Sequence, residues 1–252
     1  MLPKIKSKIY IIVLIVCGIM CFITTGCEIN STDSYSDSGV GGSLSRFTIV
    51  GNYMYAVDNQ SLKVFNITAP SAPSLVNKIK IGFDIETIFS NNSLLFIGTE
   101  TGMYIFGLDN PEQPVRLSAY SHVYSCDPVV ADENYAYVTL STDWNCGRYT
   151  NELQIIDISD PSDPELITSY DMDKPRGLGI LDNKLFICDK NHLKVYDKSS
   201  VLSLQLINNY NVDAIDVIPL ESILLVVAEN GLYEYEYDQN GLTLLSSVYE
   251  TD

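Results

Sequence analysis

Histidine, tryptophan and positive charge are all scarce in this chain of 252 residues. It has two His and one Trp, and its 15 Lys and Arg stand against 32 Asp and Glu, for a formal net charge of −17. So few histidines leave little scope for histidine-based acid–base chemistry. The excess of acid argues against a nucleic-acid partner, because phosphate binding requires clustered positive charge. We also expect no metal and no cofactor, because no zinc motif, calcium-loop spacing or phosphate-cradling glycine loop occurs.

Long hydrophobic runs are missing except near the N-terminus, where Ile9–Ile23 is apolar almost throughout and follows three lysines. As a helix at about 1.5 Å per residue, this run spans about 22 Å, which is short of the ~30 Å hydrocarbon core of a bilayer. A cleaved export signal therefore fits better than a transmembrane helix, and we expect a signal peptide over residues 1–26.

The residues that end this leader, Thr24-Thr25-Gly26-Cys27, resemble the lipobox of bacterial lipoproteins. The resemblance implies that Cys27 is lipid-modified and holds the protein at the bacterial cell envelope, on the outer membrane or the cell surface. Several acyl chains on one cysteine give stable membrane attachment. Residues 27–44, rich in Ser, Gly and Asp, are typical of a flexible tether. Ordinary secretion and an uncleaved anchor are the alternatives.

The rest of the chain, residues 45–252, is one unit repeated five times at intervals of about 41 residues. Each copy holds four short runs of apolar, aromatic and β-branched residues bounded by Gly, Asn, Asp or Pro, which is typical of strands. A four-stranded unit of this length is the period of a β-propeller blade. The sequence therefore predicts an all-β fold, a five-bladed β-propeller with four antiparallel strands per blade. The expected blades are residues 45–82, 83–122, 123–172, 173–212 and 213–252.

The copies run in phase with the chain, so no strand is left over to mix the two ends of the chain in one blade. A small sheet cannot bury both of its faces alone. We therefore expect the ring to close mainly by packing of the first blade against the fifth.

The sequence pattern of the repeats is clearest in the third copy, over Leu153–Ile167 (LQIIDISDPSDPELI). It resembles the LVIVD repeat of bacterial surface and secreted proteins, and the other copies follow it with more changes. The resemblance implies a propeller fold and an exported lipoprotein. It implies no shared set of catalytic residues.

Two of the cysteines beyond the leader are expected to lie close together in the fold. Cys126 precedes the first strand of the third blade, and Cys146 lies in an insertion between that blade's second and third strands. In a propeller these two loops emerge on the same side, and an export context is oxidising, so we expect a disulfide between them. We expect Cys188, in the apolar run Leu185–Cys188, to be an inert buried thiol.

The insertion Ser141–Asn151 contains the only Trp of the chain, Trp144, together with Arg148 and Tyr149. Aromatic rings beside polar groups suit the capture of a sugar or a peptide, so these three residues are candidate ligand contacts at the rim. The alternative is a surface loop whose Trp144 only covers the edges of the blades.

A charged residue occurs at or just before the start of each innermost strand. These residues are Arg46, Glu86, Asp127, Arg176 and Asp216. Propeller topology brings the strand starts together at one mouth of the central channel, where the five charges are candidates for binding a polar ligand. The alternative is that they neutralise one another.

Three functions remain open at this point. The first, which we favour, is a non-enzymatic surface module that binds a glycan, a peptide or an envelope protein. The second is a scaffold subunit of an envelope complex without a small ligand. The third is a glycan hydrolase that uses Glu86, Asp127 and Asp216, whose separations would decide the mechanism. We assign no catalytic residue, and we expect the domain to be a monomer.

Overall fold

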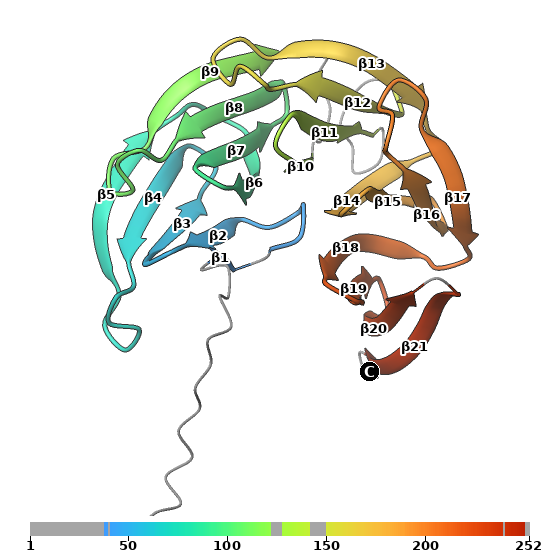
Figure 1. Ribbon diagram of the computed structural model, residues 1–252. Coiled ribbons are helices and arrows are strands. Elements are labelled where there is room, and N and C mark those ends of the chain that lie inside the picture. Colours follow the sequence, from blue (N-terminus) through green and yellow to red (C-terminus); the bar gives the residue numbers. More distant parts are fainter. Residues whose placement is uncertain (1–37, 40, 122–127, 142–149, 239, 250–252) are drawn as a thin grey trace, which may run out of the picture. The chain divides into compact units, whose positions relative to one another are not determined.

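The computed structural model describes residues 38–39, 41–121, 128–141, 150–238 and 240–249. Over these residues it contains strands and no helix, and the strands form five antiparallel sheets that follow one another along the chain as the blades of a propeller (Figure 1). The predicted all-β, five-bladed architecture is confirmed. No helix in the described part of the chain is long and apolar enough to cross a membrane.

Each sheet is built from consecutive strands, so the innermost strand comes first and the outermost last. The first sheet contains β1 (Ser38–Gly39), β2 (Phe47–Val50), β3 (Tyr53–Val57), β4 (Ser61–Asn66) and β5 (Ser74–Lys80). The second contains β6 (Ile85–Asn91), β7 (Leu94–Thr99), β8 (Gly102–Gly107) and β9 (Val115–Ser121). The third contains β10 (Val129–Ala131), β11 (Tyr135–Leu140), β12 (Glu152–Asp157) and β13 (Glu165–Asp171).

The last two sheets repeat this order. The fourth contains β14 (Pro175–Leu181), β15 (Lys184–Asp189), β16 (His192–Asp197) and β17 (Gln205–Tyr210). The fifth contains β18 (Ala214–Leu220), β19 (Ile223–Ala228), β20 (Gly231–Asp238) and β21 (Gly241–Tyr249). The short β1 is the one addition to the predicted four strands, and it pairs with β2.

The turns between the first and second strands share one backbone geometry in the first, second, fourth and fifth sheets. Gly51, Asn92, Asp182 and Glu221 occupy equivalent positions and have φ of 56°, 50°, 50° and 52°. Gly, Asn and Asp are the residues that adopt this left-handed conformation most readily. We call the side of the propeller that carries these turns the first-turn side. The starts of the innermost strands and the turns between second and third strands lie on the opposite side.

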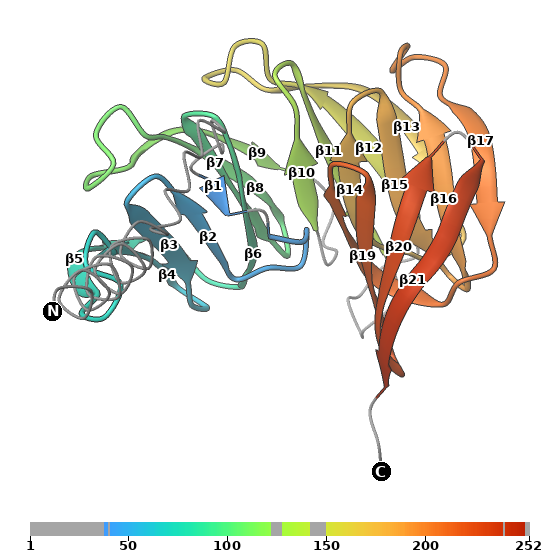
Figure 2. The same ribbon diagram turned by 60° about the horizontal axis from the view of Figure 1, so that its bottom comes forward.

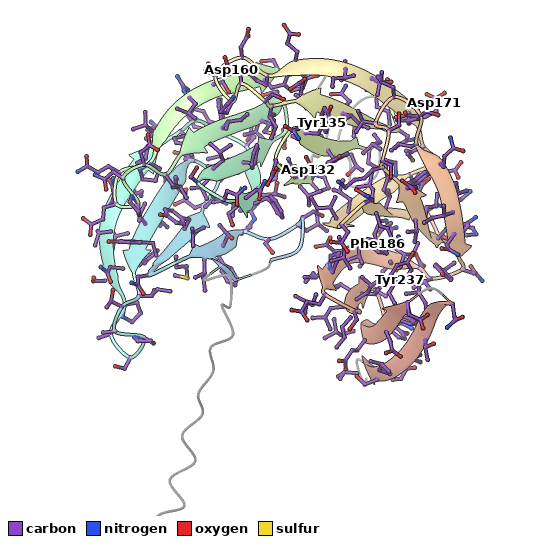
Figure 3. All side chains as sticks on the ribbon, in the orientation of Figure 1. Asp132, Tyr135, Asp160, Asp171, Phe186 and Tyr237 are labelled. Atoms are coloured by element: carbon purple, nitrogen blue, oxygen red, sulfur yellow. The ribbon has the colours of Figure 1, made fainter. Side chains whose placement is uncertain are left out.

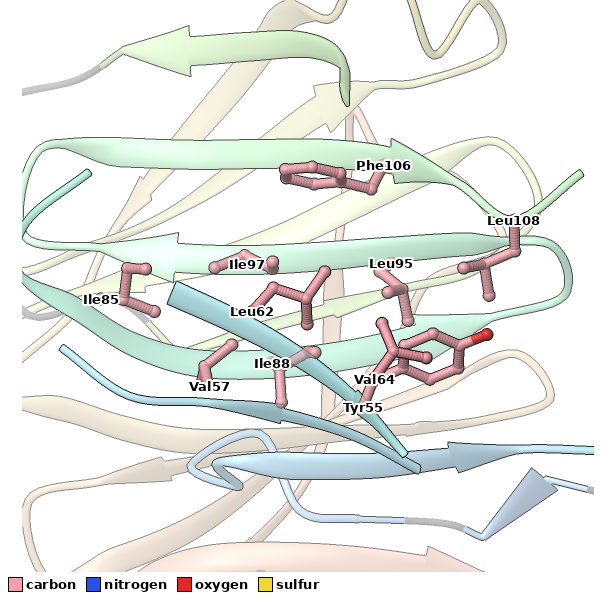
Figure 4. Close-up of a cluster of buried hydrophobic side chains, with 10 residues drawn as sticks. All are labelled: Tyr55, Val57, Leu62, Val64, Ile85, Ile88, Leu95, Ile97, Phe106 and Leu108. Carbon is pink, nitrogen blue, oxygen red and sulfur yellow. The ribbon is translucent and has the colours of Figure 1, made fainter. Parts of the chain in front are cut away.

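The core lies between successive sheets. Clusters of buried apolar side chains join the first sheet to the second, the second to the third, the third to the fourth and the fourth to the fifth. Figure 4 shows the first of these clusters, to which Tyr55 and Leu62 contribute from the first sheet and Leu95 and Ile97 from the second. Burying one such side chain contributes about 1.5–3 kcal/mol.

The described residues show no corresponding cluster between the fifth sheet and the first, so the expected packing of these two blades is not what the structure contains. The link between them is polar and central. Ser43 Oγ donates a hydrogen bond of 2.8 Å to the Asp216 carboxylate, and the Leu44 amide donates one of 3.2 Å. The chain that precedes β2 thus bridges to the innermost strand of the fifth sheet.

This bridge corrects the expected boundary of the tether. Residues 38–39 and 41–44 belong to the folded domain, because β1 pairs with β2 and Ser43 is completely buried. Gly42 is needed for the close approach, since a Cβ there would lie 2.1 Å from Asp216 Oδ2. The Ser and Gly residues that we took as signs of flexibility serve close packing at this point.

Candidate functional site

A cavity of about 840 Å³ lies on the first-turn side, where the first turns of the second, third and fourth sheets come together. Most of its lining residues carry a polar group. The polar lining residues are Asn91, Asn92, Asp132, Glu133, Asn134, Tyr135, Tyr137, Asp182, Asn183, Lys198 and Ser199. Asp132 and Tyr135 lie close together at the first turn of the third sheet (Figure 3).

Asp132 organises the floor of this cavity. Its Oδ1 accepts hydrogen bonds from the backbone amides of Asn134 and Tyr135, at 3.0 and 2.9 Å. Its Oδ2 accepts from the Tyr137 hydroxyl at 2.9 Å and from Lys198 Nζ at 2.8 Å. Because Lys198 comes from the fourth sheet, the ion pair joins two blades at the base of the cavity.

The Lys198 side chain is only 10% exposed, and its ammonium also lies 5.7 Å from the centre of the Tyr137 ring. Burial alone would raise the pKa of Asp132, but the Lys198 ammonium and the amides of Asn134 and Tyr135 outweigh it and hold that pKa below its ordinary value. Burial raises the pKa of Tyr137, so its hydroxyl stays protonated and donates. These groups form a fixed floor rather than a set of free ligands.

The groups left to meet a ligand stand at the rim. Asn92, Glu133, Asn134 and Asn183 are exposed side chains that can donate or accept hydrogen bonds. Tyr135 adds a half-buried ring beside them. Amides, carboxylates and an aromatic ring suit a ligand that carries several hydroxyl groups.

A second cavity of about 530 Å³ lies on the same side, between the fourth and fifth sheets. It shares Leu181 and Asp182 with the first cavity and adds Glu221, Ser222 and Asp238. The hollowed surface of the first-turn side therefore continues from the third sheet to the fifth.

The charges predicted at the channel mouth lie on the opposite side. The structure describes four of them, Arg46, Glu86, Arg176 and Asp216, and Asp127 lies outside the described residues. The innermost strands β6, β14 and β18 each have a register shift where these charges stand. A bulge of this kind redirects the side chains next to it.

Two of the mouth arginines have partners within the protein. Arg46 Nη2 donates to the Ile85 carbonyl at 3.3 Å, which links the first sheet to the second. Arg176 lies 3.6 Å from an Asp213 carboxylate oxygen and 3.8 Å from one of Glu229, and its side chain is 15% exposed. The charge of Arg176 is thus neutralised by the fifth sheet, by residues other than those we expected to face it.

Asp216 is not open to a ligand. It is 6% exposed, and its carboxylate accepts hydrogen bonds from Ser43, Leu44 and its neighbour Val217, the last at 3.0 Å. Ser43 Oγ in turn accepts from the Leu178 amide at 2.8 Å, so the fourth sheet joins the same network. The expectation that Asp216 binds a ligand is therefore corrected, because the N-terminal segment occupies both of its oxygens.

The remaining sequence-based site residues are partly beyond what the structure describes. The predicted disulfide of Cys126 and Cys146 and the rim residues Trp144, Arg148 and Tyr149 lie outside the described residues, as does the lipid-bearing Cys27. Cys188 is buried on β15 with a free thiol, as expected, and burial raises its pKa.

The cavity was not predicted from the sequence, because only the charges at one position of the repeat, the start of the innermost strand, were compared. Asp132 and Lys198 stand at different phases, and only the stacking of the third and fourth sheets brings them together. A signal was present, however. The first turns of the second to fifth blades are all polar, and those of the second, third and fourth carry Asn.

Burial raises the pKa of Asp216 to about 6, against an ordinary value near 3.9. A group whose pKa is raised by folding stabilises the fold below its unfolded pKa, and this contribution is lost as the pH rises through the folded pKa. We therefore expect the free energy of unfolding of the wild type to fall by about 2–3 kcal/mol between pH 4 and pH 7, relative to that of Asp216→Asn. Urea titrations of both proteins across this range measure the difference. Parallel pH profiles would mean that Asp216 is not buried in this way.

Comparisons with known proteins agree with the repeat pattern and the fold. The LVIVD repeat model matches residues 41–80 and 125–172, which are the first and third blades. A functionally unknown protein from Desulfotomaculum acetoxidans is similar in structure, with a TM-score of 0.65 and 11% identity over 85% of this chain and 70% of that one. A protein from Lactobacillus plantarum has a TM-score of 0.61 and 13% identity over 83% of this chain and 70% of that one.

A more distant likeness is to Hsv2 of Kluyveromyces lactis, with a TM-score of 0.51 and 9% identity over 79% of this chain and 60% of that one. Identities this low indicate a shared fold and nothing more. The curated proteins contain no match to this sequence. The repeat pattern, the five four-stranded blades and the structural likeness lead to one conclusion: the chain is a five-bladed β-propeller that contains LVIVD repeats.

Proposed function

We propose that this protein is a binding module of the bacterial cell envelope and that its ligand, a short glycan, occupies the cavity on the first-turn side. The observation that carries the proposal is the combination of a preformed volume of about 840 Å³ with a floor fixed by the Asp132–Lys198 pair. A fixed floor lowers the cost of binding, because the cavity does not have to form when the ligand enters.

The chemistry of the rim selects the ligand class. Asn92, Asn134 and Asn183 offer amide donors and acceptors, and Tyr135 offers a ring face beside them. Sugar hydroxyls both donate and accept, and the apolar face of a sugar ring packs on aromatic rings. The exposed carboxylates of Glu133 and Asp182 disfavour an acidic ligand, so a neutral or amino-bearing glycan fits best.

The two alternative functions have less support. A hydrolase built on Glu86, Asp127 and Asp216 would need an accessible third carboxylate, and that of Asp216 is buried under Ser43. A scaffold subunit without a small ligand gives no role to the cavity or to its ion-paired floor. Among the described residues, no three side chains of His, Cys, Asp or Glu are grouped so that they could hold a metal ion, and the proposal invokes none.

The proposal is tested with the purified protein on a glycan array, followed by titration of the glycans that bind. Asn183→Ala removes one rim hydrogen bond and should weaken binding by about three- to tenfold. Asn191→Ala is the matched control, because Asn191 is an exposed Asn in the turn between β15 and β16, on the opposite side. Equal affinity of the two variants, or loss of binding only in Arg176→Ala, would move the site away from this cavity. A silent array would favour the scaffold.

The envelope location rests on the resemblance of Thr24–Cys27 to a lipobox, and it is tested separately. In a bacterial host grown with labelled palmitate, the wild type should incorporate label and Cys27→Ala should not. Cys188→Ala is the control, because its thiol is buried in the domain. Label that persists in Cys27→Ala would refute the lipid anchor.

A further inference from the structure

One face of the fifth sheet is uncovered, although the equivalent face of each earlier sheet is buried. Leu232 is equivalent to Leu62, Met103, Leu153 and Leu193, whose exposed fractions are 0%, 1%, 0% and 0%. Each of those four packs against the next sheet, whereas Leu232 is 41% exposed. Its direct neighbour across the strand pair, Val248, is 67% exposed.

The first sheet presents the complementary face, the one that elsewhere packs against the preceding sheet. Phe47 is equivalent to Ile88, Val129, Leu178 and Val217, which are at most 1% exposed, yet Phe47 is 55% exposed. In Figures 1 and 2 the β18–β21 sheet has the β14–β17 sheet on one side and no sheet directly against the other. In the described part of the chain, one face of the fifth sheet and one face of the first sheet therefore have no neighbouring sheet packed against them.

The two faces carry opposite charge. We call the side chains of Leu225, Val227, Leu232, Glu234 and Val248 the blade-five face, and those of Phe47, Met54, Lys63, Phe65 and Lys78 the blade-one face. Lys63 and Lys78 are directly opposite in the pairing of β4 with β5. Lys63 Nζ pairs with Asp58 Oδ2 at 2.9 Å, so Asp58 balances one of the two charges and an incoming carboxylate would chiefly meet Lys78.

Within the molecule, residues at the positions of Glu234 and Lys63 take part in the same clusters between sheets. Val64 and Tyr104 belong to the cluster between the first and second sheets, and Val195 and Tyr233 to the cluster between the fourth and fifth. Val64 and Val195 stand at the position of Glu234, and Tyr104 and Tyr233 stand at the position of Lys63. A contact between a blade-five face and a blade-one face would therefore bring Glu234 close to Lys63 and Lys78.

We propose that the occupant of the blade-five face is the blade-one face of a second copy of this chain, docked head to tail as successive blades dock within one copy. The chain's own first sheet does not cover the face, since Phe47 and Leu232 are both exposed. A second copy supplies a surface with the right shape, apolar residues and charge. The contact is heterologous, so each dimer keeps one free face of each kind and larger assemblies follow at higher concentration. The domain is then not the monomer that the sequence led us to expect.

The test is sedimentation velocity of the full chain, purified in a mild detergent, over a range of concentrations. The wild type should form dimers and larger species as the concentration rises. Glu234→Lys and Lys78→Glu should each weaken self-association by about tenfold or more, because each places like charges across the contact. Glu165→Lys and Lys190→Glu are the matched controls, because both residues are exposed and lie on neither face.

Mixing the two charge-reversal variants distinguishes the proposed contact from other modes of self-association. Equimolar Glu234→Lys and Lys78→Glu should regain the dimers and larger species that each variant alone loses, because both contacts between the unlike variants pair opposite charges. The double variant should assemble like the wild type. A wild type that stays monomeric throughout, as it would if its own first and fifth sheets closed together, overturns the proposal. So does a dimer that ignores both charge reversals, as a contact between two blade-five faces or through the detergent-bound leader would.

Discussion

The structure depends on one constraint, which is that a small four-stranded sheet has two apolar faces and can cover neither by itself. Every buried cluster in the described residues lies between two successive sheets, and none lies within a single sheet. Tyr55, Phe96, Tyr137 and Phe186 illustrate the rule, since each faces the next sheet and each is completely buried. Stability in such a series comes from nearest-neighbour contacts, so the terminal sheets differ from the inner ones.

The same constraint explains the two polar networks that join blades. Where apolar faces meet, shape decides the contact, but at the edges of the sheets charged groups must find partners. On the first-turn side, Asp132 and Lys198 pair across the third and fourth sheets and close the floor of the cavity. At the centre, Ser43 connects Asp216 to the Leu178 amide and holds the start of the domain against its last two sheets. One network closes the floor of the cavity and the other ties the chain together.

Much of the fold could be predicted from the sequence, because the repeat is visible in the residues themselves. The spacing of the copies and the four short runs in each predicted five four-stranded blades, and equivalent positions such as Leu62 and Leu193 are buried in equivalent ways. The partners of the site residues could not be predicted. Asp216 was placed at the correct strand start, yet its partner Ser43 lies 173 residues away in a segment whose composition suggested a tether. The position of a residue in the repeat predicts where it lies in its own blade. Its contacts with other blades depend on how the blades pack against one another.

The central claim is that the inner sheets are covered on both faces and the fifth sheet is not, and one matched pair of substitutions tests it most directly. Leu193→Ala removes a side chain buried between two sheets and should lower the free energy of unfolding by about 2–5 kcal/mol. Leu232→Ala removes the same side chain at the equivalent position of the fifth sheet, where it is 41% exposed, and should cost less than about 1 kcal/mol in dilute solution. Urea unfolding of both variants at a concentration where the wild type is monomeric provides the comparison. Equal losses would mean that the fifth sheet is covered in the folded monomer, and the account would be wrong.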